Sequence, residues 1–188
     1  MTIRSIHIKG SPVLHARASE VEVFDRSLKK LVNDMYETMD EAPGVGLAAP
    51  QVGVALRVFV YDYEDAEGNP VRGEVINPKL ELGKLSLEPA SEDTDSEGCL
   101  SFPGERFPTR RADWVKVTGV NLRQEPIEVE ATGWLARIFQ HEFDHLEGTL
   151  YVDKLESRYL PEVDEITERR GWGKPGKTWI PGLDNLED

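Results

Sequence analysis

The pattern HEFDH at residues 141–145 constrains this chain more than any other part of it. Side chains four residues apart on an α-helix lie one above the other, so His141 and His145 can bind a single ion. Glu142 then lies beside that ion, where it can take a proton from bound water. The alternative is a helix with two hydrogen-bonded histidines and a surface glutamate, and the apolar residues on the rest of the face argue against it. The pattern therefore predicts a helix whose buried face carries a metal site.

The third ligand of that site is not evident from the pattern itself. A catalytic zinc needs three protein ligands and one open position, and this helix supplies only two. The astacin-like pattern HExxHxxGxxH matches as far as Gly148, but Tyr151 stands where its last histidine belongs. The residues that remain as the third ligand are Cys99, Glu165, His7 and His15. A thermolysin-like site would use the downstream Glu165, whereas a cysteine thiolate is a strong ligand for zinc or iron.

Cys99 is the single cysteine of the chain and lies in the run EGCLSFPG between Gly98 and Gly104. A lone cysteine is more often a small buried hydrophobic residue than a ligand. It could also be a nucleophile activated by a histidine, but that interpretation leaves Glu142 and the paired histidines without a purpose. The residues alone therefore leave its role open.

Helix and strand signals alternate along the chain. Apolar residues recur at helical spacing in residues 25–42. Strands are predicted at residues 56–62, 73–82, 114–122 and 126–131. The motif helix runs from Thr132, which can cap it, to about Glu147 and ends at Gly148. Residues 88–97 are rich in acids and are predicted as a solvated loop. We expect an α+β domain in which one buried helix packs on small antiparallel sheets.

The segment GVGLAAPQVG at residues 44–53 superficially matches the dinucleotide-binding fingerprint GxGxxA. That fingerprint requires a strand before it and a helix that opens within it. Here a helix comes first, and Pro50 and Gly53 leave no room for another helix before the next strand. We interpret the segment as a glycine-rich turn that places Gln51, an uncharged donor and acceptor, in a tight apolar loop.

The character of the sequence changes after residue 158. A short helix at residues 162–170 precedes the run GWGKPGKTWIPGLDNLED, which repeats Pro-Gly turns and has little to bury except Trp172, Trp179 and Ile180. We therefore divide the chain into a domain at residues 1–158 and a short helix with an extended or mobile tail at residues 159–188. Four cations lie here, namely Arg169, Arg170, Lys174 and Lys177. They can complement the helix C-terminus or contact phosphate.

Size and charge limit the classes of protein that remain. The chain has 188 residues, enough for one domain with a sizeable core, and its formal net charge is −13. This excess of acid opposes binding to DNA. No apolar run is long enough to span a bilayer, and the first residues lack the apolar core of a secretory signal. A single cysteine fits a reducing compartment. We expect a soluble, cytoplasmic protein with no DNA or membrane partner.

Three segments together carry a family resemblance. GVGLAAPQ, EGCLS and HEFDH follow the order of the motifs GxGxAAxQ, EGCxS and HExxH that mark the peptide deformylases. The chain resembles this family over roughly residues 4–155, and three ordered motifs are far more specific than one. The resemblance implies a metallohydrolase that removes the N-formyl group from the starting methionine of nascent proteins and releases formate. It also implies an α+β fold in which antiparallel sheets cradle the motif helix.

The resemblance also implies a role for each site residue. The metal ligands that it implies are Cys99, His141 and His145. The ion that the resemblance implies in the cell is ferrous iron, although ligand identity alone does not separate iron from zinc, nickel or cobalt. Glu142 takes a proton from bound water and passes it to the departing amine. The oxyanion donors are the Gln51 side-chain amide and the Leu100 backbone N–H.

For the substrate, the resemblance implies a formyl-methionyl peptide that adds as a strand along backbone groups of Val45, Gly46 and Gly98. The methionine pocket that it implies is lined by Val45, Trp134, Arg137, Ile138 and His141. Arg137 departs from an apolar lining, and we expect its charged end at the pocket mouth with only its stem in contact. Because ribosomes carry phosphate, a weak contact between the tail cations and the ribosome is a further expectation.

Two rival functions remain at this point. One is an endopeptidase whose third ligand is Glu165, and the other is a non-catalytic module with a structural metal. A closed structural site would need a fourth protein ligand, and the sequence offers no obvious one. The sequence does not specify the oligomeric state or the residues preferred beyond methionine.

Overall fold

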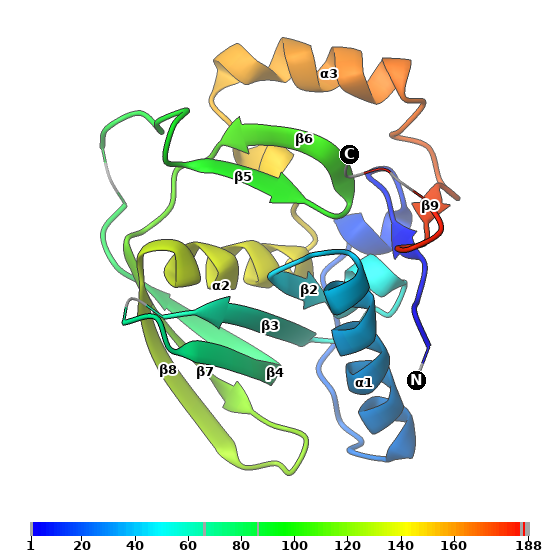
Figure 1. Cartoon of the computed structure of the whole chain (residues 1–188), viewed down its shortest axis with the longest axis vertical. Coiled ribbons are helices and arrows are strands. Elements are labelled where there is room, and N and C mark those ends of the chain that lie inside the picture. Colours follow the sequence, from blue (N-terminus) through cyan, green and yellow to red (C-terminus); the bar gives the residue numbers. More distant parts are fainter. Residues whose placement is uncertain (1, 66, 86, 185, 187–188) are drawn as a thin grey trace.

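The computed structural model describes residues 2–65, 67–85, 87–184 and 186 (Figure 1). Its α-helices are α1 (Arg26–Glu41), α2 (Gly133–Leu146) and α3 (Leu160–Arg169). Its strands are β1 (Ile6–His7), β2 (Gly46–Ala48), β3 (Val58–Glu64), β4 (Pro70–Leu82), β5 (Ser96–Cys99), β6 (Phe102–Pro108), β7 (Trp114–Val120), β8 (Pro126–Thr132) and β9 (Thr178–Trp179). Short 3-10 helices lie at Pro12–His15, Ala49–Val52, Tyr151–Lys154 and Ser157–Tyr159.

The strands form three antiparallel sheets. The largest has five strands in the order β2-β3-β4-β7-β8, and the pairs β5-β6 and β1-β9 form two small sheets. The register between β4 and β7 shifts between Ile76 and Lys79, where Asn77 has a φ of 52°. The predicted α+β class is confirmed.

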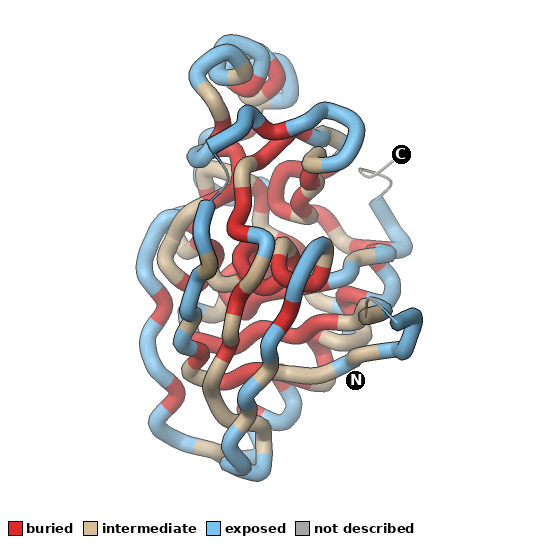
Figure 2. Tube along the Cα trace, turned by 90° about the vertical axis from the view of Figure 1, so that its left-hand side faces the viewer, coloured by how far each residue is buried: buried red, intermediate tan, exposed pale blue. Residues whose placement is uncertain are grey.

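Helix α2 lies in the middle of the molecule. Figure 1 shows it between the five-stranded sheet and the β5-β6 hairpin, with α3 on the outer side of that hairpin. Apolar residues on its sheet side, among them Leu135, Phe139 and Leu146, pack in one cluster with Phe59 and Val117 of the sheet. Figure 2 shows the buried residues gathered between these layers and the exposed ones on the outer strands and loops. Most side chains on both sides of α2 are therefore buried.

Helix α1 closes one end of the five-stranded sheet. Asp25 caps it, because its side chain accepts hydrogen bonds from the backbone nitrogens of Ser27 at 2.9 Å and Leu28 at 3.0 Å. Met35 and Met39 are fully buried against β2 and β3. The helix thereby supports β2, which lies at the edge of the sheet and borders the site described below.

The two ends of α2 differ from each other. Thr132 is the N-cap residue, but its side chain makes no cap hydrogen bond, so the predicted capping by Thr132 is wrong. Gly148 follows the C-cap with a φ of 76°, as predicted for the residue that ends the helix. A Cβ there would also come within 2.8 Å of the Ala16 backbone. Gly148 thus ends α2 where the N-terminal segment crosses it.

The C-terminal segment packs into the body of the protein. Strand β9 pairs with β1, and Trp172 and Trp179 are buried in one cluster with Phe102 of β6. Trp172 and Trp179, which the sequence offered as residues that the tail could bury, are thus packed against the body of the protein. Periodicity could not reveal this, because the partners of the two tryptophans are supplied by strands far away in the sequence. The division of the chain at residue 158 stays a prediction. The last predicted tail residues, 185 and 187–188, lie outside the described part of the chain.

Within the described residues, helix length and apolar composition rule out every helix as a membrane span.

Candidate metal centre

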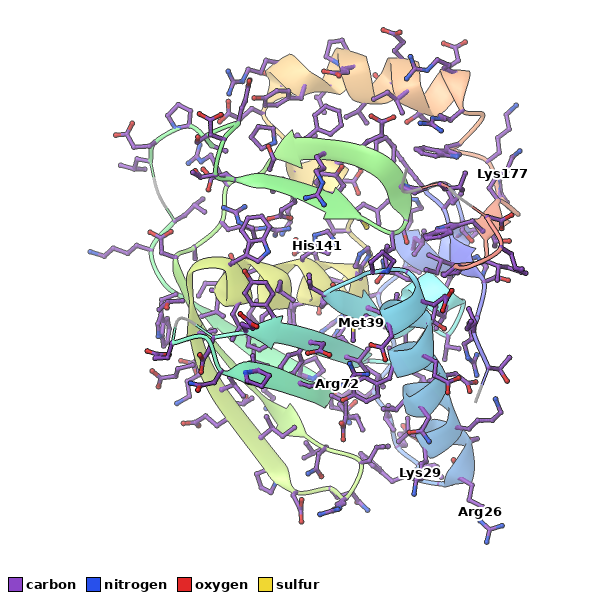
Figure 3. The ribbon with its side chains drawn as sticks, in the orientation of Figure 1. Arg26, Lys29, Met39, Arg72, His141 and Lys177 are labelled. Carbon is purple, nitrogen blue, oxygen red and sulfur yellow. The ribbon has the colours of Figure 1, made fainter. Side chains whose placement is uncertain are left out.

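Helix α2 and strand β5 bring three donor atoms together. Cys99 is the last residue of β5, and the helical spacing of His141 and His145 turns both rings toward it. Ligand atoms of these three residues lie within 4.8 Å of one another, and Sγ of Cys99 is 3.4 Å from Nε2 of His145. Figure 3 shows His141 between α2 and the β5-β6 hairpin. The Cys99, His141 and His145 side chains are therefore the candidate ligands, and the group they form is called the metal centre below.

The donor chemistry of the metal centre fits a divalent ion. Nδ1 of His141 is bonded to Oε2 of Glu97 at 3.0 Å, which leaves Nε2 of that ring for an ion. Sulfur and ring nitrogen are the donors that zinc and iron accept. Among the described residues, Oε2 of Glu142 is buried without a hydrogen-bond partner. A buried polar atom without a partner beside three converging donors indicates a place for an ion and its water.

Glu142 lies against the first motif segment. A Cβ on Gly46 would come within 2.4 Å of Oε1 of Glu142, so the glycine leaves the space that the carboxylate occupies. Glu142 is 4% exposed, and this burial raises its pKa to about 7. A carboxyl group with such a pKa can both accept and return a proton near neutral pH.

Gln51 is held in one orientation. Its Oε1 accepts a hydrogen bond from the Ala48 backbone nitrogen at 2.8 Å, so its Nε2 faces the other way. That nitrogen lies 3.8 Å from Sγ of Cys99 and donates to Oγ of Ser101 at 3.3 Å. The turn predicted from GVGLAAPQVG is the short strand β2 followed by a 3-10 helix, and Gly53 ends it with a φ of 80°. The turn thus aims an amide N–H group at the metal centre.

A buried ionic network lies behind His141. Glu97 is 3% exposed and accepts hydrogen bonds from Nε of Arg111 at 2.8 Å and from Nη2 at 2.9 Å. Arg111 also pairs with Asp144 of α2 at 2.5 Å, and Lys154 pairs with the same carboxylate. Burial alone raises the pKa of Glu97, but hydrogen bonds from Arg111 and His141 outweigh it and hold the pKa well below its ordinary value. The carboxylate thus fixes the ring of His141.

Residues 88–97 follow the sequence prediction only in part. Most of the segment is exposed, as expected for a solvated loop. Ala90 and Glu97 are buried, and Glu97 is the charged one, because it lies in β5 and contacts His141 of α2. The assignment of Glu97 to the solvated loop is wrong, since its compensating charges, Arg111 and Arg137, come from other parts of the chain.

A cavity of about 400 Å³ opens beside the metal centre. All residues that the sequence analysis placed in substrate binding line it, namely Val45, Gly46, Gly98, Trp134, Arg137 and Ile138. Cys99, Leu100, Gln51, His141 and Glu142 line it as well. The structure therefore brings all the predicted site residues except His145 to one cavity wall, with His145 directly behind Cys99.

The charged end of Arg137 makes ion pairs. Its Nη1 bonds Oε1 of Glu97 at 2.8 Å, and its Nη2 bonds Oδ1 of Asp95 at 2.7 Å. The guanidinium also lies 5.3 Å from the ring centroid of Trp134. The charged end is therefore bound by buried and half-buried carboxylates, and its predicted place at the pocket mouth stays a prediction.

The other ligand candidates lie elsewhere. Glu165 is an exposed residue of α3 that pairs with Arg169 at 4.0 Å. His7 is bonded to Ser11 at 2.7 Å, and Nε2 of His15 accepts from the Gly10 nitrogen at 3.1 Å. Tyr151, which stands where the astacin-like pattern has its last histidine, lies with its ring 5.8 Å from that of His141, but its hydroxyl donates to the Glu105 carbonyl at 2.9 Å. The endopeptidase hypothesis based on Glu165 is therefore overturned.

Sequence reasoning missed the supporting residues of the metal centre, which are Glu97, Ser101, Arg111 and Asp144. Glu97 stands directly in the EGCLS motif, and Asp144 lies three residues after His141 on the same helix, so both positions offered a signal. Arg111 offered none, because it follows a strand with no motif around it. Its role depends on a contact that only the folded chain makes.

The fold and the metal centre define a class of protein. Three donors, two of which line a cavity, suit hydrolysis better than a structural ion, which would need a fourth protein ligand. The adjoining Glu142 supplies the proton-transfer group that such chemistry requires. The chain is a metal-dependent hydrolase of α+β fold.

Comparison with known proteins identifies the family. The polypeptide deformylase family model matches residues 3–160. Peptide deformylase 2 of Corynebacterium efficiens is 50% identical, over 98% of this chain and 96% of that protein. Peptide deformylase of Mycolicibacterium paratuberculosis is 48% identical, over 97% of this chain and 96% of that protein. The crystal structure of the Synechococcus elongatus peptide deformylase with actinonin has a TM-score of 0.75 and 36% identity, over 91% of this chain and 90% of that one.

The chain belongs to the polypeptide deformylase family. It is a metal-dependent hydrolase that removes the N-formyl group from nascent peptides. The family implies a single metal ion, and Cys99, His141 and His145 are the ligands that this chain can offer.

Proposed function

We propose that Cys99, His141 and His145 hold the ion and that Glu142 is the general base beside it. The observation that carries the proposal is the convergence of the three donors within 4.8 Å next to a buried carboxylate oxygen that has no partner among the described residues. When bound, a divalent ion lowers the pKa of a coordinated water toward about 7 from about 16 and polarises the carbonyl under attack. Beside that ion, Glu142 would accept a proton from the attacking water and return it to the leaving amine.

Gln51 and Leu100 are the proposed oxyanion donors. The hydrogen bond from Ala48 orients the Gln51 amide, so its N–H group can face the developing charge without reorganisation. Leu100 follows the metal ligand Cys99 directly and lines the same cavity. Loss of one such donor typically lowers the rate about 10²–10³-fold.

The proposed substrate site lies between two strand edges. Strand β2 is an edge of the five-stranded sheet, and β5 pairs with β6 on one side. An extended formyl-methionyl peptide can add along Val45, Gly46 and Gly98, whose backbones border the cavity. The methionine side chain would then face Trp134, Arg137 and Ile138. The buried ion pairs of Arg137 support a role for its stem and the Trp134 ring, rather than its charge, in that pocket.

We also infer that the ion is ferrous in the cell and that the protein works in the cytoplasm. The sulfur ligand and the single cysteine support an oxygen-sensitive ion in a reducing compartment, while zinc, nickel and cobalt remain chemically compatible with the same donors.

The experiment that tests the proposed function measures metal content and formate release together. Protein purified without air should contain one ion per chain and release formate from formyl-Met peptides. Removal of the ion with a chelator should abolish turnover, and readdition of ferrous iron should restore it. Full metal content with no formate release would favour the rival, non-catalytic module.

A weak contact with the ribosome is a second proposal, supported by surface charge. Lys174 and Lys177 are exposed, and Figure 3 shows Lys177 beside β9, far from Arg26 and Lys29 of α1. Arg169 and Arg170 are partly neutralised by Glu165 and Glu105. Two exposed lysines in an acidic protein can make salt-sensitive contacts with phosphate.

A charge-matched pair of variants tests the ribosome contact. The variant Lys174→Glu with Lys177→Glu should co-sediment less with ribosomes at low salt and should keep its turnover of short peptides. The variant Arg26→Glu with Lys29→Glu changes the net charge equally at the other end of the molecule and should co-sediment like the unmodified protein. Equal losses of co-sedimentation in both variants would show that only net charge matters, and would contradict a contact made by the tail.

A further inference from the structure

A chain of hydrogen bonds joins the C-terminal segment to the sulfur of Cys99. Nε1 of Trp179 donates to the carbonyl oxygen of Leu100 at 2.8 Å. The backbone nitrogen of Ser101 donates to Sγ of Cys99 at 3.4 Å. The Leu100 carbonyl and the Ser101 N–H belong to one planar peptide group. Trp179 is therefore a single peptide group away from the sulfur atom.

The backbone and side chain of Ser101 are both hydrogen-bonded. It is fully buried, its carbonyl accepts from the Lys9 nitrogen at 2.9 Å, and its hydroxyl accepts from Nε2 of Gln51 at 3.3 Å. The Lys9 carbonyl accepts in turn from the Gly173 nitrogen at 2.9 Å. Residues of the N-terminal and C-terminal segments thus surround the Leu100–Ser101 peptide group, whose N–H contacts the sulfur of Cys99.

The approach of the two segments is close. A Cβ on Gly10 would come within 2.3 Å of the Gly173 carbonyl carbon, and the φ of Gly10 is 99°. The Ile8 nitrogen donates to the Lys177 carbonyl at 3.0 Å, directly before β1 and β9 separate. These contacts fix the path of the tail and hence the place of the Trp179 ring.

We propose that Trp179 is a positioning residue for the metal centre: its indole N–H orients and polarises the Leu100–Ser101 peptide group, and the N–H of that group holds the Cys99 sulfur as a ligand. Hydrogen bonds in a chain strengthen one another. Groups that bond to a ligand atom tune its affinity for the ion. The inference rests on the proposed function in one respect, the assignment of Cys99 as a ligand.

Trp179 and Trp172 offer a matched comparison. Both are buried in the same cluster and come from the same segment, but Trp172 packs edge-on against Phe102 at 4.9 Å between ring centroids. A role in packing alone would require only an apolar ring at either position. Trp179 also lies beyond residue 160, where the match to the family model ends. The indole N–H is therefore the feature to test.

The first experiment compares Trp179→Phe with Trp172→Phe in full-length, zinc-loaded protein labelled with ¹⁵N. In Trp179→Phe the amide proton of Ser101 should move upfield, because the hydrogen bond to sulfur weakens. In Trp172→Phe it should keep its position. An unchanged Ser101 signal in Trp179→Phe, or equal shifts in both variants, would overturn the proposal.

The cobalt forms supply a readout of the ligand itself. The sulfur-to-cobalt charge-transfer band of Trp179→Phe should lie at longer wavelength, and a chelator should remove its cobalt roughly tenfold faster. The band and the release rate of Trp172→Phe should match those of the unmodified protein. A cobalt form of the unmodified protein without this band would show that Cys99 is no ligand, which separates failure of the proposed function from failure of the role of Trp179.

A measurement on the unmodified protein avoids any effect of substitution on folding. Loading with zinc should shift the indole N–H signal of Trp179 and leave that of Trp172 unchanged. Identical behaviour of the two indole signals would overturn the proposal.

Discussion

The two faces of helix α2 show how differently structure and function are specified in this chain. The face toward the five-stranded sheet is apolar, and residues such as Phe139 and Leu146 are fully buried in it. The face toward β5 is equally buried but carries His141, Asp144 and His145. Apolar residues need only a neighbour of suitable shape, whereas each buried polar group needs a particular partner. We therefore expect substitutions on the sheet face to change stability and those on the polar face to change chemistry.

The largest effect is expected from Glu142→Ala. Turnover should fall by about 10²–10⁴-fold or more, because the proton acceptor is lost, while metal content should stay at one ion per chain. Its Oε2 has no partner among the described residues, so removal of the carboxylate should not lower stability. The denaturant concentration at which the variant unfolds should be at least that of the unmodified protein. Glu142→Asp should recover little activity. Release of the metal from Glu142→Ala would make Glu142 a ligand.

Glu97→Ala should come next, and its effect should appear in stability as well as in metal binding. Removal of the carboxylate leaves Arg111 buried without its main partner, which costs about 3–5 kcal/mol of unfolding free energy. His141 also loses its orienting bond, so affinity for the ion should fall about 10–100-fold. Chelator competition and denaturant unfolding measure the two effects. Glu97→Gln keeps the shape of the side chain, so its stability and its affinity for the ion should lie between those of Glu97→Ala and the unmodified protein. An unchanged affinity in both variants would show that Glu97 does not support the metal centre.

Gly46→Ala tests the contact between β2 and α2. The new methyl group would overlap Oε1 of Glu142 and displace the carboxylate, which should lower turnover by about 10²-fold with the metal retained. The shorter side chain of Glu142→Asp should make room for the methyl group. The loss of turnover caused by Glu142→Asp should therefore be smaller in the Gly46→Ala variant than in the unmodified protein. If the two losses are strictly additive in free energy, the predicted contact is contradicted.

The smallest effect is expected on the apolar face. Phe139→Leu should lower the free energy of unfolding by about 1 kcal/mol, because it exchanges one apolar side chain for another in a cluster with Phe59 and Tyr61. Turnover per folded molecule and metal content should match those of the unmodified protein. A loss of activity without a loss of stability would show that the two faces of α2 are not separable.

The same contrast explains what the sequence could predict. Helix α1, most strands of the large sheet and the class of fold follow from periodicity, since Asp25, Met35 and Gly148 act through neighbours close in sequence or through simple burial. The HEFDH spacing predicted that His141 and His145 share one side of α2. The residue types and spacing alone left Cys99 open against Glu165, and only the resemblance favoured it before the structure brought the donors together.

The missed features all depend on partners distant in the chain. Glu97 looked like part of an acidic loop until Arg111 and Arg137 neutralised it. The tail offered Trp172 and Trp179 for burial, but the cluster that receives them is supplied by β6 and the N-terminal segment, so their partners could not be predicted. No local pattern encodes such pairings, and only the fold makes them.

The central claim is that one cysteine and two histidines bind the ion, and X-ray absorption of the metal-loaded protein tests it most directly. Zinc-loaded protein should show one sulfur neighbour at about 2.3 Å and nitrogen neighbours at about 2.0–2.1 Å, with the remaining position filled by a light atom from water. In Cys99→Ser the sulfur contribution should disappear. A zinc shell without sulfur in the unmodified protein, or one unchanged in Cys99→Ser, would contradict the account of the metal centre.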